Sequence, residues 1–280
     1  MKKERRGVEY GGVDESYFED RGLRRYAGVW SLWALGVGAV ISGDFFGWNF
    51  GLASGGFGGL LIATVIITIM YAGLCFSIAE MAAALPHTGG AYSFARSAMG
   101  PWGAYITGLA ENMEYILTPA VIVVGIGGYL GAIFGTPASV EPLWWLASYA
   151  VFVGLNVAGV ETTFRFTVLI TAMALGVLLV FWIAAIPHFD MSWALDIEPE
   201  PGHDRWLPKG IGGVLSALPF AFWFFLAIEQ LPLAAEEAQA PARDLPRGLL
   251  YGLLTLIVAA FLTLFLNAGI APGAEVLGSS

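Results

Sequence analysis

Charged residues are scarce in this sequence: Asp, Glu, Lys and Arg make up only 12% of its 280 residues, whereas 57% are hydrophobic. A soluble protein carries about a quarter charged residues, so the composition predicts an all-α membrane protein with several spans. Cys75 is the single cysteine, which excludes a disulfide framework and a cysteine metal site. The sequence also lacks a basic stripe with interleaved aromatic residues, so nothing in it indicates a nucleic-acid partner.

Seven hydrophobic runs are each long enough to cross a bilayer. They cover about residues 26–53, 56–84, 101–134, 143–160, 166–186, 211–238 and 248–266. The predicted domains are a tail at 1–25, a first five-helix repeat at 26–186, a loop at 187–210, the start of a second repeat at 211–268, and a loop at 269–280. Within the second repeat, residues 241–247 are expected to form a loop. Because a two-repeat protein is incomplete at this point, we expect the chain to be a fragment.

The positive charges predict the orientation. With a cytoplasmic N-terminus, 11 of the 13 lysine and arginine residues lie on the cytoplasmic side, and only Arg205 and Lys209 lie outside. Positive residues gather on the cytoplasmic side of membrane proteins. We therefore expect a multi-pass protein of the cell (inner) membrane with a cytoplasmic tail and extracytoplasmic loops at 187–210 and 269–280.

The first hydrophobic run is interrupted at its centre. Between Gly36 and Gly47 it holds four glycines together with Ser42 and Asp44, where a spanning helix favours leucine. An ionisable residue at membrane depth is costly and indicates function, and secondary transporters build substrate sites at such helix breaks. Close helix packing is the alternative explanation for glycines. We favour packing for the glycines at 127–131, but it does not explain a carboxylate.

The sixth run is interrupted by Ile228-Glu229-Gln230-Leu231-Pro232, because proline prevents a regular helix. Glu229 is explained equally well as a cation contact or as a cap for the half-helix that follows. The two breaks lie five spans apart, and transporters built from inverted repeats place broken helices at corresponding positions of their halves.

Two glutamates in the third run complete the candidate site. Glu111 and Glu114 share one helix face, and intramembrane carboxylates face the protein interior. They are expected to hold a substrate cation or to carry a coupling proton, unless Glu111 is merely solvated near the cytoplasm.

The charge balance of the hydrophobic runs predicts the partners. No lysine or arginine in these runs balances the carboxylates, and desolvated anions need partners or protons. We therefore expect a small cationic ligand, a lipid bilayer and a coupled proton or other ion. The three histidines lack metal spacing, so neither a metal nor a cofactor is expected.

Two loop motifs resemble a known family. The segment 80–101, with Leu-Pro-His-Thr-Gly-Gly at 85–90, is similar to the loop after helix two of the amino acid–polyamine–organocation permeases. The segment 236–247 is similar to the family's sequence after helix six, and Ser-Gly at 42–43 matches its break in helix one. The segments 41–49 and 108–114 resemble the ethanolamine permease branch. The resemblance implies the leucine-transporter fold of two five-helix inverted repeats, with roughly twelve spans in the complete protein.

The resemblance also implies roles for single residues. Ser42 and Gly43 fall where relatives hold a substrate carboxylate, Trp223 falls where an aromatic residue covers bound substrate, and Glu229 matches a carboxylate near the gate. The predicted substrate-binding residues are Ser42, Gly43, Asp44, Glu114, Tyr115, Trp223, Leu226, Ala227 and Glu229. The predicted gating or proton-coupling residues are Glu111 and Glu80.

Asp44 departs from the family pattern. Amino acid carriers have an apolar residue at this position, since a carboxylate there repels the carboxylate of an amino acid. An amine without a carboxylate is attracted instead. We therefore predict a secondary active permease for a small organic amine, with ethanolamine as the first choice.

The alternatives come from three classes: transporters, receptors and proteases. A cationic amino acid or polyamine permease or exchanger is the nearer one. A seven-helix receptor is disfavoured because such receptors usually place the N-terminus outside, and an intramembrane aspartyl protease would need a second aspartate at membrane depth. No enzyme activity is expected.

Overall fold

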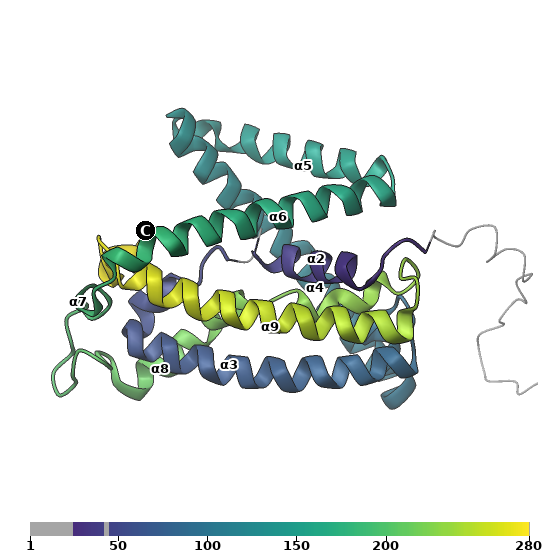
Figure 1. The fold of residues 1–280 in the computed structure, drawn as a ribbon, viewed down its shortest axis with the longest axis horizontal. Coiled ribbons are helices and arrows are strands. Elements are labelled where there is room, and N and C mark those ends of the chain that lie inside the picture. The colour runs from purple at the N-terminus through teal and green to yellow at the C-terminus, as the bar shows by residue number, and fades with distance from the viewer. Residues whose placement is uncertain (1–24, 42–44, 280) are drawn as a thin grey trace, which may run out of the picture.

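The structure is a computed structural model that describes residues 25–41 and 45–279. These residues form an assembly of helices (Figure 1). The described residues contain no β-strand, only one bridged pair, Ala27 and Ala238. The α-helices are α2 (Val29–Ala39), α3 (Phe50–Ala84), α4 (Gly90–Phe134), α5 (Glu141–Val157), α6 (Val160–Ala185), α7 (Met191–Ala194), α8 (Gly210–Ala221), α9 (Pro241–Ala268) and α10 (Ala274–Ser279). The 3-10 helices are η2 (Ala138–Val140), η3 (Ile186–His188), η4 (Phe222–Phe224) and η5 (Ile228–Ala234). The predicted all-α membrane fold is confirmed.

Six helical segments in the described part of the chain are long and apolar enough to cross a membrane. They correspond to the second to seventh predicted runs and cover Phe50–Ala84, Gly90–Phe134, Ala138–Val157, Arg165–His188, Gly210–Ala234 and Pro241–Ala268. The first predicted run is divided instead. Its helix α2 is only 11 residues long, and the chain next enters a helix at Phe50, beyond the predicted break.

Two of the long helices turn sharply at a glycine. Gly56 in α3 (φ 70°) and Gly100 in α4 (φ 76°) adopt the left-handed backbone conformation, which glycine reaches without the steric cost of a Cβ. The turn at Gly56 coincides with the predicted start of the second run. The turn at Gly100 separates the segment 90–99 from the predicted third run, which begins at Pro101 because proline suits the first turn of a helix.

Three boundaries differ from the predicted ones. Helix α9 begins at Pro241 rather than near 248, because proline suits its first turn and the Asp244 carboxylate accepts a hydrogen bond from the Ala240 N–H (3.1 Å). Helix α8 ends at Ala221, ahead of the predicted break at 228–232, and the chain continues in 3-10 turns. Residues 274–279, predicted as loop, form α10.

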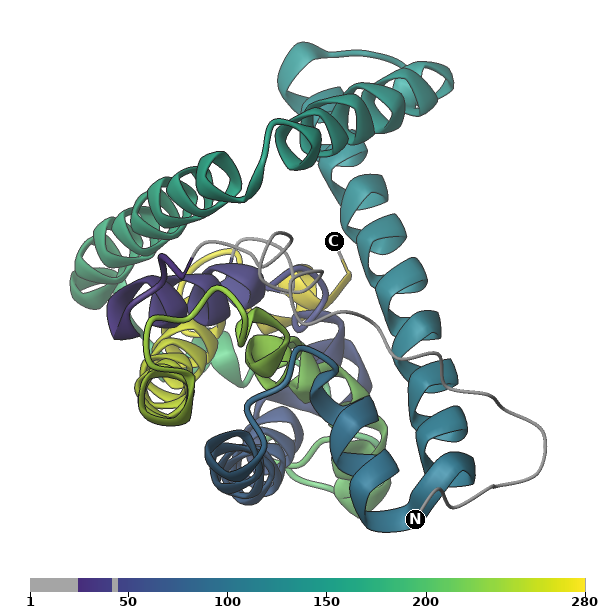
Figure 2. The same ribbon diagram turned by 90° about the vertical axis from the view of Figure 1, so that its right-hand side faces the viewer.

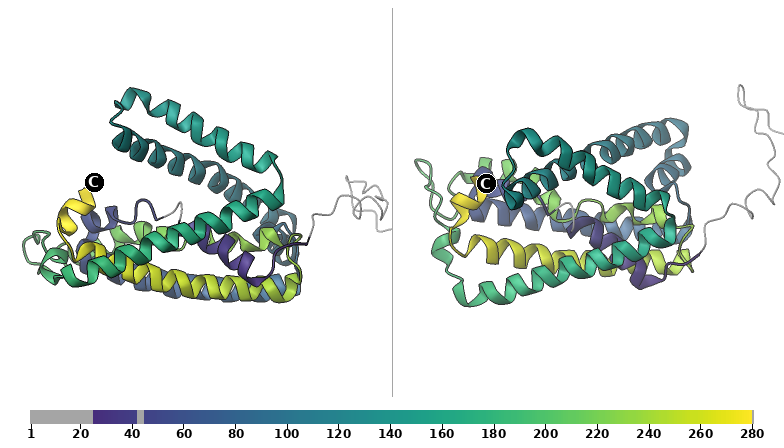
Figure 3. Two further views of the ribbon diagram at one scale, coloured as in Figure 1. Left: turned by 45° about the horizontal axis from the view of Figure 1, so that its top comes forward. Right: turned by 90° about the horizontal axis from the view of Figure 1, so that it is seen from above.

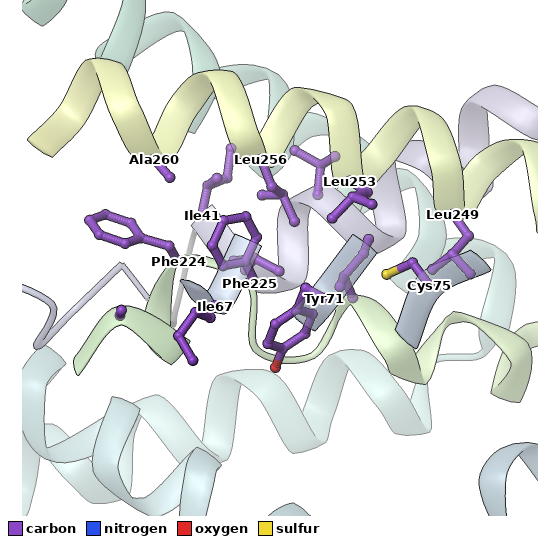
Figure 4. Close-up of a cluster of buried hydrophobic side chains, with 14 of the residues drawn as sticks. Ile41, Ile67, Tyr71, Cys75, Phe224, Phe225, Leu249, Leu253, Leu256 and Ala260 are labelled. Carbon is purple, nitrogen blue, oxygen red and sulfur yellow. The ribbon is translucent and has the colours of Figure 1, made fainter. Parts of the chain in front are cut away.

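The core lies where α3, α8 and α9 pack together, and it surrounds the second helix break. Phe224 and Phe225, just after α8, are fully buried. Figure 4 shows Phe225 between side chains of α9 and Tyr71 of α3, on which its ring stacks at a centroid distance of 5.4 Å. The chain around the break is therefore held by the densest part of the hydrophobic core.

Helices α4 and α5 stand to one side of this core (Figures 2 and 3). Helix α4 packs mainly on α5, and a smaller contact joins it to η5. Much of the surface of α5 is apolar and exposed, as at Leu143, Leu146, Val151 and Phe152. Such a surface matches the hydrocarbon interior of a bilayer.

The side chain of Ile228 lies where η5, α2 and α9 come into close contact. A Cβ added at Gly36 of α2 would lie 2.7 Å from Ile228 Cδ1, and one added at Gly252 of α9 would lie 2.9 Å from the same atom. Small residues let membrane helices approach closely. Here two glycines create the space that one isoleucine side chain occupies.

Gly252→Ala is therefore expected to destabilise the protein by about 1–3 kcal/mol, the usual cost of overpacking a close-packed core. The midpoint of thermal unfolding in detergent should fall. The matched control is Gly73→Ala in α3, where an added Cβ meets nothing within 4 Å. Because alanine favours helix over glycine by up to about 1 kcal/mol, the control midpoint should stay or rise. Equal midpoints for the two variants would contradict the packing described at Ile228.

Candidate functional site

The break in the first run is described on its two sides only. Ser42, Gly43 and Asp44, all predicted to bind substrate, lie outside the described residues. The N–H of Phe45 donates to the carbonyl of Val40 (3.1 Å), which holds the two sides of the break together. A cavity of about 210 Å³ adjoins the break and is lined by Ile41, Phe45, Phe46, Ile122, Gly125, Ile126 and Tyr129.

The break in the sixth run is built around Ala227. This residue has φ 80° and ψ −11°, the left-handed conformation that costs a residue with a side chain roughly 1–3 kcal/mol. The strained turn separates the 3-10 turns η4 and η5, so no α-helical hydrogen-bond ladder crosses it. Strain of this kind persists only where surrounding structure holds it, and it is frequent at functional sites.

Glu229 is fixed by this turn. Its Oε1 accepts a hydrogen bond from the N–H of Ala227 (3.2 Å), so the carboxylate does cap the broken backbone. Its Oε2 is buried and has no hydrogen-bond partner among the described residues. A buried carboxylate oxygen without a partner is costly. The two interpretations of Glu229 are thus compatible, because one oxygen caps the turn and the other is available to a ligand.

The two breaks meet through aromatic side chains. Phe224, in the second break, contacts Phe45 edge to face at 5.4 Å and stacks on Trp48 at 5.2 Å. Trp223 lies beside Gly47, where an added Cβ would be 3.7 Å from its ring. The residues on both sides of the first break are therefore packed against the second, as a site shared by the two breaks requires.

One carboxylate of α4, that of Glu114, contacts the second break. Glu114 Oε1 accepts a hydrogen bond from Gln230 Nε2 (2.7 Å), and the charges of Glu114 and Glu229 lie close enough to act on each other. The Tyr115 hydroxyl donates a long hydrogen bond to Glu111 Oε1 (3.5 Å). Glu114 therefore lies beside Glu229, whereas the hydrogen bond of Glu111 is to Tyr115 on its own helix. No lysine or arginine occurs in the sequence of either segment, 101–134 or 210–242, so neither supplies a counter-charge.

The remaining predicted residues are placed less centrally. Leu226 is half-buried in the strained turn. Glu80 is exposed near the C-terminal end of α3, and no hydrogen bond within the described chain joins it to the other carboxylates. Gln230 was not predicted, although its amide makes the shortest hydrogen bond of the group. A polar side chain within the interruption of a span was the signal that would have identified it.

A second cavity lies between α2 and η5, and Gln230 is one of the residues that line it. Its volume is about 290 Å³. Its lining is mostly apolar and consists of Leu35, Gly36, Ala39, Ala227, Gln230, Leu231, Leu233, Ala234 and Glu237.

The two loop motifs noted in the sequence meet at the end of this cavity. The Thr88 hydroxyl donates to Glu236 Oε1 (3.1 Å), and Leu233 adjoins Gly90. The carbonyl of Glu237 accepts hydrogen bonds from the N–H groups of Tyr26 and Ala27 (both 2.8 Å). Burial, and then the negative charge of Glu236, raise the pKa of the Glu237 carboxyl above its ordinary value.

Comparison with known proteins identifies the family. The amino acid permease family model matches residues 31–275. An uncharacterized transporter of Rhizobium meliloti is 34% identical over 92% of this chain and 55% of its own length. A branched-chain amino acid permease of Bacillus subtilis is 29% identical over 92% of this chain and 58% of its own, and human cationic amino acid transporter 4 is 25% identical over 85% and 39%. The chain spans about half the length of the curated relatives it matches. Because the family model covers most of its residues, the chain belongs to the amino acid permease family, within the amino acid–polyamine–organocation superfamily.

Proposed function

We propose that this protein is a secondary transporter that carries a small cationic organic amine across the cell membrane. The observation that carries the proposal is the buried Oε2 of Glu229, which lies beside Glu114 and has no hydrogen-bond partner among the described residues. An ammonium group placed between these carboxylates would supply the missing hydrogen-bond donor and the missing positive charge. A neutral ligand would supply only the donor.

The site would bind the two ends of the amine differently. Glu229 and Glu114 would hold the ammonium, with Gln230 orienting the Glu114 carboxylate through its hydrogen bond. Backbone groups at the helix breaks would bind a hydroxyl, since backbone groups that lose their helical partners inside a membrane must find others. Trp223, half-buried beside the first break, would cover the ligand.

Asp44 favours an amine without a carboxylate. Its position after Ser42 and Gly43 would add a third negative charge near the site. That charge repels the carboxylate of an amino acid and attracts an amine. Ethanolamine, a small hydroxylated amine, is therefore the proposed substrate.

A cationic amino acid is the second candidate. The observation that favours it is the similarity to relatives named cationic amino acid transporters. Such a substrate could place its side-chain cation between the glutamates. It would have to place its own carboxylate away from Asp44.

The proposed arrangement in the membrane follows the charges. The N-terminal tail and the loops at 87–100 and 236–247 would lie in the cytoplasm, and the segment 187–210 outside. Residues 26–186 would form the first five-helix repeat, and residues 211–268 would begin the second. Proton uptake on one of the α4 glutamates would couple transport to an ion gradient.

A competition assay tests the substrate class. The protein in proteoliposomes is expected to bind radiolabelled ethanolamine, and unlabelled ethanolamine should displace the label while leucine should not, because leucine brings a carboxylate and no second cation. Lysine and putrescine serve as further competitors. Specific binding of radiolabelled lysine or putrescine, with no specific binding of radiolabelled ethanolamine, would favour the second candidate. Displacement of the ethanolamine label by leucine as effectively as by unlabelled ethanolamine would reject a cation site.

A further inference from the structure

The cavity between α2 and η5 touches the candidate site through two residues, Ala227 and Gln230. The side chain of Gln230 donates to Glu114 on one side, and it also lines the cavity on the other. Neither Glu114 nor Glu229 lines that cavity. Ala227, whose N–H donates to Glu229, and Gln230, whose amide donates to Glu114, therefore lie between the carboxylates and the cavity, and Gln230 is the one of the two with a side chain that can rotate.

Glu237 is the charged group of this cavity. Its backbone is fixed by the two hydrogen bonds from residues 26 and 27, so its side chain is held at the cavity wall. The carboxylate forms no hydrogen bond or ion pair with any described residue, in contrast to its neighbour Glu236, which accepts from Thr88. A carboxylate that has no partner among the described residues, on a largely apolar wall, attracts a cation small enough to enter.

The electrostatics of the loop agree with this assignment. Burial and the nearby charge of Glu236 raise the pKa of Glu237, which means that its negative charge is under-compensated in the protein as described. A bound cation would relieve that cost. The chemistry on the cavity wall thus matches that of the proposed substrate.

We propose that this cavity is a second binding site for the transported amine, in which Glu237 holds the ammonium and Gln230 separates it from the site at Glu114 and Glu229. The proposal rests on the proposed function. The amine would occupy the cavity at Glu237 on its way to or from the helix breaks, at the end of the bundle that carries the loops 87–90 and 236–240. Gln230 would act as a positioning residue that gives its hydrogen bond to Glu114 whenever the passage is closed.

Binding stoichiometry tests this second site. Ethanolamine binding to the purified protein is expected to fit two sites in the wild type, and Glu237→Gln should weaken one of them by tenfold or more while changing the other less than threefold. Glu236→Gln is the matched control, because it removes an equal charge one residue away and outside the cavity. It should leave both sites within threefold.

The failures of the two proposals are distinguishable. A single site in the wild type that Glu237→Gln leaves unchanged would overturn the second site and leave the proposed function standing. Absence of ethanolamine binding in every variant would overturn both. Equal losses in Glu237→Gln and Glu236→Gln would show a general effect of loop charge and would also overturn the second site.

Thiol labelling gives a readout that does not depend on affinity. Ala39 lines the cavity and is exposed, whereas the native Cys75 is fully buried and serves as the internal control. An Ala39→Cys variant should react with a cationic methanethiosulfonate several-fold faster than with an anionic one, and ethanolamine should slow the reaction. Adding Glu237→Gln should remove the preference for the cationic reagent, and adding Glu236→Gln should keep it. No preference in Ala39→Cys alone would contradict the role of Glu237.

Discussion

Replacing Glu229 with glutamine is expected to weaken ethanolamine binding by about 100-fold or more. Removing one partner of a buried charge pair costs about 3–5 kcal/mol, and each 1.4 kcal/mol or so is a factor of ten in affinity. The substitution should not unfold the protein. The amide oxygen of glutamine can still accept the hydrogen bond from Ala227, and the change removes a buried charge that has an unpartnered oxygen. The midpoint of thermal unfolding without ligand should therefore stay or rise.

The matched control for this prediction is Glu275→Gln, because Glu275 is exposed on α10 and carries the same charge. It should leave affinity within about twofold. Glu114→Gln should also weaken binding, and the double variant Glu114→Gln, Glu229→Gln should lose less than the sum of the two single losses, since both carboxylates contact one cation. Unchanged affinity in Glu229→Gln would remove Glu229 from the site, whatever the stability of the variant.

Replacing Asp44 with asparagine is expected to change both affinity and selectivity. Losing the carboxylate should weaken ethanolamine binding by about 100-fold, because a close charge contact in a binding site is worth about 2–5 kcal/mol. It should also reduce the repulsion of a substrate carboxylate. Lysine, which brings a carboxylate as well as a cation, should therefore compete better against the label in Asp44→Asn than in the wild type.

Asp44→Glu supplies the control for that result, since it keeps the charge and moves it by one methylene. We expect it to retain a large part of the affinity for ethanolamine and to keep lysine a poor competitor. Both variants should express at near-normal levels. Equal ethanolamine affinity in the wild type and in Asp44→Asn would place the first break outside the binding site.

The sequence was sufficient to predict that the sixth run is interrupted close to Pro232 and that Glu111 and Glu114 lie on one face of a helix. Glu111 and Glu114 are three residues apart, and helical periodicity places such residues together. Pro232 marks the second break because its missing N–H cannot support a regular helix. Local chemistry decides these features, so a single sequence contains them.

Other features depend on contacts between distant segments. Helix α8 ends early at Ala221, and Ala227 adopts the left-handed conformation, in a segment that packs on α3 and α9, and the identity of these two alanines predicts neither feature. Pro241 did not indicate the start of α9, because proline occurs both in loops and in the first turn of a helix. The partnership of Gln230 with Glu114 joins residues 116 positions apart, which no local pattern encodes.

The contact at Ile228 has a consequence for how the protein can move. Its Cδ1 occupies the space in front of both Gly36 and Gly252, so the Ile228 side chain interlocks sterically with α2 and α9 at the same time. Sliding α2 along α9 would drive this methyl group into backbone, which close-packed interiors do not tolerate. We therefore expect α2, α9 and η5 to move together as one rigid unit. A change of shape that opens the carboxylates to one face of the membrane would move η5 together with α2 and α9, and the chain would bend where it enters and leaves η5, near Ala227 and near residues 238–240.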